Sequence, residues 1–158
     1  MLLRRIAMSL GLMVSMGTML AARAQTPTKE PGPPFPDMTG QYCTAFQVLL
    51  HAITNDASTI TFSDGRIHIA GHVVLSATNV VTKKTIIVNA TGPGAVTADG
   101  TTFRLEGPAL LFGEAGFFGP GSPPELSAVV GVTIVDLTAG TILQRARNST
   151  DLCPLLAQ

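Results

Sequence analysis

The sequence predicts an all-β domain, built as a single antiparallel meander that forms a barrel or a sandwich of about eight or nine strands. Val, Ile and Thr dominate short alternating runs, as is typical of half-buried strands. Turn sequences rich in Gly, Pro, Asn and Asp separate these runs at intervals of about 8–12 residues. No helical segment lies between the runs, so the connections that parallel strands would need are missing.

The N-terminus has the features of a secretory signal peptide over residues 1–24. A basic start, Met1–Arg5, precedes the apolar stretch Ile6–Leu20, and small residues follow at Ala22 and Ala24, where a signal peptidase reads them. The apolar stretch is shorter than the ~20 residues that span a bilayer. We therefore expect cleavage after Ala24, export to a secreted or periplasmic location, and no transmembrane segment in the mature chain.

Residues 25–41 contain five prolines. Proline removes a backbone donor and favours extended polyproline geometry, so this composition predicts a disordered arm. The β-domain is then expected over residues 42–158.

Turn chemistry and β-branched runs define the first half of that domain. Thr44–Ile53 is an apolar run that fits either a strand or a short helix, and Ser58–Phe62 is a predicted strand that ends in the hairpin turn Ser63–Gly65. Arg66–Thr78 alternates apolar odd positions with polar even positions, which predicts a long strand. Gly71 in its middle predicts a bulge or a tight bend.

The second half contains further predicted strands and a terminal helical turn. Asp99 and Gly100 form a second hairpin signal, and Gly107 and Pro108 separate two of the strands. The chain ends in Leu152–Ala157, which is predicted to make a short helical turn against the core. The expected strands are Thr85–Ala90, Ala95–Ala98, Thr101–Leu105, Ala109–Phe112, Leu126–Leu137 and Thr141–Ala146.

Cys43 and Cys153 are the only cysteines, and they lie near opposite ends of the mature chain. In an exported protein such an isolated pair predicts one structural disulfide that joins the first structured residues to the last. Redox catalysis is the competing interpretation, but the chain has no CxxC motif and no basic residue beside either cysteine.

His51, His68 and His72 are the only histidines. His68 and His72 share the polar side of one predicted strand, where four residues separate them by roughly 13 Å. Zinc holds its nitrogen ligands at about 2.1 Å, so this pair does not chelate one ion unless the strand bends sharply at Gly71. We interpret the histidines as half-exposed sheet residues and expect neither a metal nor another cofactor.

The sequence motifs of nucleophilic and phosphate chemistry are missing. Ser122 lacks the second glycine of the hydrolase nucleophile elbow. The segments Gly92–Gly94 and Gly119–Gly121 carry proline where a phosphate-binding loop needs free amides. Bridged cysteines are not available as nucleophiles. A pair of carboxylates that converges only in three dimensions stays open, because the sequence does not reveal their separation.

The segment Gly113–Glu125 is the strongest functional lead. Phe117 and Phe118 stand side by side in a loop rich in Gly and Pro, where strand alternation cannot bury both rings. One interpretation is that one or both rings fold back as a plug over an open end of a barrel. The functional interpretation is an exposed aromatic pair that contacts a partner, a lipid surface or an apolar ligand.

Several turn motifs resemble a loosely defined set of uncharacterised secreted bacterial β-proteins, over about residues 43–156. They are Asn79–Lys83, Asn89–Gly94, Asp99–Thr101, Gly107–Phe112 and Asp151–Cys153. The resemblance implies export and a β-fold, and it implies no catalytic activity.

Without its signal peptide the chain has seven Lys and Arg against ten Asp and Glu, a net charge of −3. This balance excludes nucleic acid as a leading partner, because phosphates require many cationic contacts. We expect a secreted, non-enzymatic β-domain that acts by binding or as a surface component, with an apolar ligand or a protein as partner. The alternatives are a small barrel that carries an apolar ligand beneath the Phe117–Phe118 loop, and a secreted hydrolase.

Overall fold

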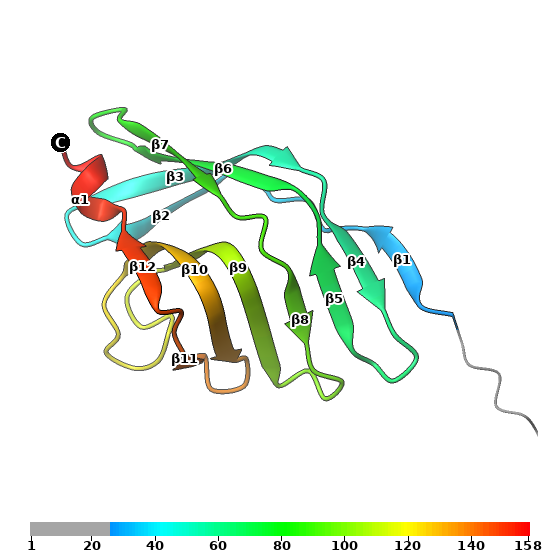
Figure 1. The fold of residues 1–158 in the computed structure, drawn as a ribbon. Helices are drawn as coiled ribbons and strands as arrows, with labels where there is room; N and C mark the ends of the chain where they lie inside the picture. The colour runs from blue at the N-terminus through cyan, green and yellow to red at the C-terminus, as the bar shows by residue number, and fades with distance from the viewer. Residues whose placement is uncertain (1–25) are drawn as a thin grey trace, which may run out of the picture.

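The structure, a computed structural model, describes residues 26–158, in which the regular elements are β-strands apart from one short helix (Figure 1). The predicted signal peptide over residues 1–24 lies outside the described residues. Twelve strands in the described part of the chain form two antiparallel sheets, which we call the large sheet and the small sheet. No helix within residues 26–158 has both the length and the apolar character needed to cross a bilayer.

The large sheet has eight strands in the order β1-β4-β5-β8-β9-β10-β11, and β12 pairs with β10 beside β11. The small sheet has the order β2-β3-β6-β7, and helix α1 (Cys153–Leu156) follows β12. The strands of the large sheet are β1 (Thr28–Pro31), β4 (Ser58–Thr61), β5 (Ile67–Ala70), β8 (Gly94–Val96), β9 (Thr102–Gly113), β10 (Glu125–Asp136), β11 (Thr141–Gln144) and β12 (Asn148–Asp151). Those of the small sheet are β2 (Met38–Cys43), β3 (Phe46–Asn55), β6 (Val73–Asn79) and β7 (Thr85–Asn89).

The meander bends where its strands pass from one sheet to the other. Short connections join β3 to β4, β5 to β6 and β7 to β8, and Gly71 lies in the second of these connections. Arg66–Thr78, expected as one long strand with a bulge or a bend at Gly71, therefore bends there and forms two strands in different sheets. In Figure 1 the small sheet lies above the upper ends of β9 and β10, whereas β4, β5 and β8 extend away from it as a single layer. One half of the molecule therefore has two layers and the other half has one.

The main core lies in the two-layered half, between the small sheet and strands β9 and β10. Alternating residues of the small sheet meet Leu110 and Leu126 of the large sheet, and the C-terminal residues Leu152 and Leu156 fill one end. The buried residues from the small sheet are Tyr42, Cys43, Val48, Leu50, Leu75, Ala77 and Val88. The fold is all-β and antiparallel as predicted, and it is sandwich-like; the alternative of a closed barrel is not formed.

The predicted disulfide between Cys43 and Cys153 is confirmed. It joins the end of β2 to the start of α1, with the two Cα atoms 5.6 Å apart. Cys43 is 1% exposed and belongs to the main core, whereas Cys153 is half-buried and packs against it. The bridge therefore lies at the margin of the main core. The first and last parts of the described chain are thereby held together.

The N-terminal segment differs from the disordered arm expected over residues 25–41. Residues Thr28–Pro31 form β1, which pairs with β4, and Met38–Cys43 form β2, which pairs with β3. Proline is compatible with β1 because this strand is at the edge of the large sheet, where one side of its backbone needs no ladder partner. Pairing with distant strands thus outweighs the local preference for polyproline geometry.

The structure also corrects the strand predictions elsewhere in the chain. Thr44–Ile53, left open between strand and helix, is a turn at Thr44 and Ala45 followed by strand β3 from Phe46 onward. The two strands expected on either side of Gly107 and Pro108 are one strand, β9, which pairs with β10 without a register shift. The Pro108 carbonyl accepts a bond from Gly92 N–H, so its missing N–H also points away from β10 and no bond to β10 is lost. Strand β12 was not predicted.

Asn79 fastens the C-terminal helix to the end of the β6 strand. Its side chain is buried, its Oδ1 accepts the N–H groups of Val81 and Thr82 at 2.9 and 3.2 Å, and its Nδ2 donates to the Leu156 carbonyl at 3.1 Å. An Asn79→Ala substitution would leave these backbone groups without partners. We expect it to lower the free energy of unfolding by about 2 kcal/mol, measured by urea denaturation.

The matched control for Asn79→Ala is Asn148→Ala, because Asn148 is exposed on β12. We expect the control to stay within about 0.5 kcal/mol of the wild type. Equal losses in the two variants would show that the Asn79 bonds contribute nothing specific.

Candidate functional site

The loop between β9 and β10 carries the two phenylalanines that the sequence singles out. Phe117 is 63% exposed, whereas Phe118 is half-buried, and their rings meet edge to face with centroids 5.0 Å apart. The Phe117 side chain lies against the backbone of Gly113 at the end of β9. The loop thus presents one aromatic ring to solvent, and its role as a contact loop stays a prediction.

The three histidines lie apart and each has its own neighbour. His51 Nδ1 is 2.6 Å from Asp37 Oδ1 at an exposed position, and His68 stacks edge to face on Phe62. His72 Nδ1 is 3.3 Å from Thr91 Oγ1. Within residues 26–158, no cluster of three His, Cys, Asp or Glu side chains could hold a metal ion.

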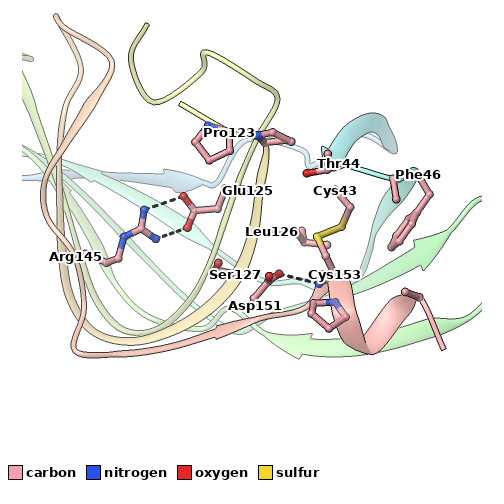
Figure 2. A pocket seen from close by; sticks show the side chains of 14 residues that line it. Cys43, Thr44, Phe46, Pro123, Glu125, Leu126, Ser127, Arg145, Asp151 and Cys153 are labelled. Carbon is pink, nitrogen blue, oxygen red and sulfur yellow. Dashed lines mark hydrogen bonds and ion pairs between the residues drawn. A yellow bond between two sulfur atoms is a disulfide. The ribbon is translucent and has the colours of Figure 1, made fainter. Parts of the chain in front are cut away.

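A hollow of about 400 Å³ opens beside the disulfide, between the β2–β3 turn, the start of β10 and helix α1 (Figure 2). Figure 2 shows Glu125 and Arg145 facing one another on one wall and the Cys43–Cys153 bridge on another. Arg145 donates two bonds to the Glu125 carboxylate, and these bonds raise the pKa of the guanidinium. Asp151 accepts the Cys153 N–H at 2.9 Å. The charged groups of this hollow are engaged in holding the fold.

A second hollow, of about 340 Å³, brings His68 and Glu106 to the same wall of the large sheet. Arg104 donates through Nε to Glu106, so this carboxylate has a cationic partner. No Ser, Thr or Cys is among the described residues that line the hollow. The arrangement therefore lacks a nucleophile beside the histidine, which hydrolase chemistry of the Ser-His or Cys-His type would need.

One side of the single-layered part of the large sheet is apolar. Residues directly opposite one another in paired strands share a face, and one such row contains Ile67, Val96, Phe103, Val135 and Ile142. Two residues along their strands, Ile69 and Leu105 lie on the same face. We call these seven half-buried residues the apolar face: Ile67, Ile69, Val96, Phe103, Leu105, Val135 and Ile142.

Part of this face is covered by the chain itself. Ala146, between β11 and β12, is buried, and its N–H bonds Thr133 Oγ1 at 3.2 Å over the β10 strand. No strand or loop of residues 26–158 forms a second layer over β5 and β8, as Figure 1 shows. The part of the apolar face on β5, β8 and the start of β9 is therefore open.

A small hollow of about 160 Å³ lies on the open part, at the bend between the sheets. Ile69, Phe103 and Leu105 of the apolar face contribute to its walls, and Gly92 and Gly94 leave space because they have no side chains. No charged or hydrogen-bonding side chain lines it; the other lining residues are Ala57, Ala70, Gly71, Val73 and Ala90. An apolar cavity of about 150 Å³ accommodates a benzene-sized group, so this hollow fits one ring or branched aliphatic group.

The sequence indicates the apolar positions of this site but not their exposure. Ile67, Ile69, Val73 and Leu75 alternate as one apolar side of the predicted strand, yet only Val73 and Leu75 pack against the main core. The bend at Gly71 separates the two pairs and leaves the isoleucines in the single layer. Comparison with known proteins adds no assignment, since no protein family, curated protein or solved structure matches the chain.

Proposed function

We propose that this protein is an exported, non-enzymatic binding domain that holds an apolar group of its partner on the apolar face. The observation that carries the proposal is the open part of the apolar face, on β5, β8 and the start of β9, with its hollow. Large apolar faces without cover are typical of interaction sites in exported and soluble proteins. The disulfide fits an oxidising compartment outside the cytoplasm, in agreement with the signal peptide that the sequence predicts.

Two other functions have less support. A carrier that encloses its ligand needs an empty interior, but Leu50, Leu75, Leu110 and Leu126 fill the space between the sheets. A hydrolase of the Ser-His or Cys-His type needs a nucleophile beside a histidine, and the hollow of His68 contains no Ser, Thr or Cys. Glu106 and Glu125, which line two of the hollows, are each paired with an arginine. An open apolar face requires neither an internal cavity nor a catalytic pair.

The proposal predicts that an Ile69→Ser variant loses affinity for an apolar probe. Ile69 lines the hollow, so the serine hydroxyl removes apolar contact area and places a polar group against the ligand. We expect the dissociation constant for anilinonaphthalene sulfonate, measured by fluorescence titration, to rise by about fivefold, which corresponds to about 1 kcal/mol of lost apolar contact.

The matched control for Ile69→Ser is Ile60→Ser. Ile60 is also a half-buried isoleucine of the large sheet, but it is opposite His68, on the other face. We expect its variant to bind the probe as the wild type does. The proposal fails if the wild type shows no saturable binding, or if the two variants lose affinity equally.

A further inference from the structure

Strand β7 is the last strand of the small sheet, and one of its edges has no partner strand within residues 26–158. Asn79 N–H bonds the Lys84 carbonyl, and Ala90 N–H bonds the Val73 carbonyl. These bonds, just outside both ends of β7, show that the backbone N–H and C=O groups of its even-numbered residues point toward β6. In an antiparallel strand the N–H and C=O of one residue point to the same side. The backbone groups of Thr85, Ile87 and Asn89 therefore point outward from the sheet, and all three residues are exposed.

Two other sheet edges, β1 and β2, carry features that discourage pairing with another chain. Strand β1 is four residues long and includes Lys29, Glu30 and Pro31. At β2 the Glu114 carboxylate accepts the Gln41 N–H at 3.0 Å, and the strand has a register shift. Short length, charge, proline and bulges are the usual means by which edge strands avoid association.

Strand β7 lacks the charge, the proline and the register shift found at these two edges. Its five residues, TIIVN, include no charge and no proline, and they pair with β6 without a register shift. Ile87 at the centre is 59% exposed. An apolar, regular edge with outward-pointing backbone groups is a template for another strand.

We propose that a second copy of this chain pairs with the β7 edge, and that two β7 strands meet antiparallel about a twofold axis at Ile87. This register places Ile87 opposite the partner's Ile87 and Thr85 opposite the partner's Asn89. All three residues point their backbone groups outward, so each N–H in the row faces a carbonyl of the other copy. The register opposes no like charges, because Lys84 falls opposite the partner's Ala90. The two small sheets become one continuous sheet.

Analytical ultracentrifugation of the mature chain tests the proposal, together with an Ile87→Lys variant. Two lysines would face one another across the axis, and like charges directly opposite in paired strands destabilise the pairing. We expect the wild type to dimerise at concentrations up to about 1 mM, and the variant's dimer dissociation constant to be about tenfold higher or more. An Ile53→Lys variant is the matched control, because Ile53 is 51% exposed in the small sheet but lies on β3, away from the edge.

Amide hydrogen exchange locates the interface independently of the variants. As the protein concentration rises, exchange at Thr85, Ile87 and Asn89 should slow, while Ile86 and Val88, which already bond β6, should change little. A wild type that stays monomeric, a dimer that persists unchanged in Ile87→Lys, or unchanged exchange at the three outward amides would each overturn the proposal.

Discussion

Replacing both Cys43 and Cys153 by Ser will lower the free energy of unfolding by about 4–5 kcal/mol. The bridge joins residues that are 110 positions apart, so it greatly restricts the unfolded chain. The chain-entropy relation assigns roughly 4.7 kcal/mol to a loop of about 100 residues. Such a loss is comparable to the whole stability of a small domain. Urea denaturation followed by circular dichroism measures it.

Urea denaturation also tests the cause of this loss, which is the restriction of the unfolded chain by the disulfide. Without the bridge the unfolded chain expands, so the dependence of unfolding free energy on urea concentration should become steeper. Wild-type protein unfolded under reducing conditions is the control, and it should match the double Ser variant. A loss below about 1.5 kcal/mol, well short of the chain-entropy value, would contradict the account.

The parts of the fold that follow from short sequence signals are predictable. The turn at Ser63–Gly65 forms as expected: Gly65 has φ of +89°, which glycine tolerates, and Phe62 N–H bonds the Arg66 carbonyl at 2.9 Å. The Cys43–Cys153 pairing follows because only two cysteines exist. Both features depend on local chemistry or on counting, so they need no knowledge of the tertiary arrangement.

The remaining features depend on which distant segments meet. Pro31 in β1 argues against a strand until Ser58 of β4 is known to lie opposite it. Likewise, Ile69 belongs to an alternating apolar row that continues into the main core at Val73 and Leu75. Only the bend at Gly71 shows that Ile69 lies outside the main core. The apolar face therefore could be predicted as a set of apolar positions, but not as an open surface, because exposure depends on the number of layers.

Substituting Ala for Gly92 will lower the free energy of unfolding by about 3 kcal/mol. Gly92 is in the connection from β7 to β8, where the chain passes close to β9, and its N–H bonds the Pro108 carbonyl at 2.6 Å. A Cβ atom at this position would collide with the carbonyl oxygens of Glu106 and Pro108. Both obstacles are backbone atoms of a strand that pairs with β10 along its whole length, so neither can move aside without opening the sheet.

Gly94→Ala is the control that separates this effect from a general cost of replacing glycine. A Cβ atom at Gly94 also comes too close to another group, but that group is the far edge of the Phe103 ring, on the open part of the apolar face. The ring can turn aside there at little cost, and we expect a change within about 1 kcal/mol. If both substitutions are equally tolerated in urea denaturation, the connection between the sheets yields easily, and the close approach at β9 is not what holds the bend in place.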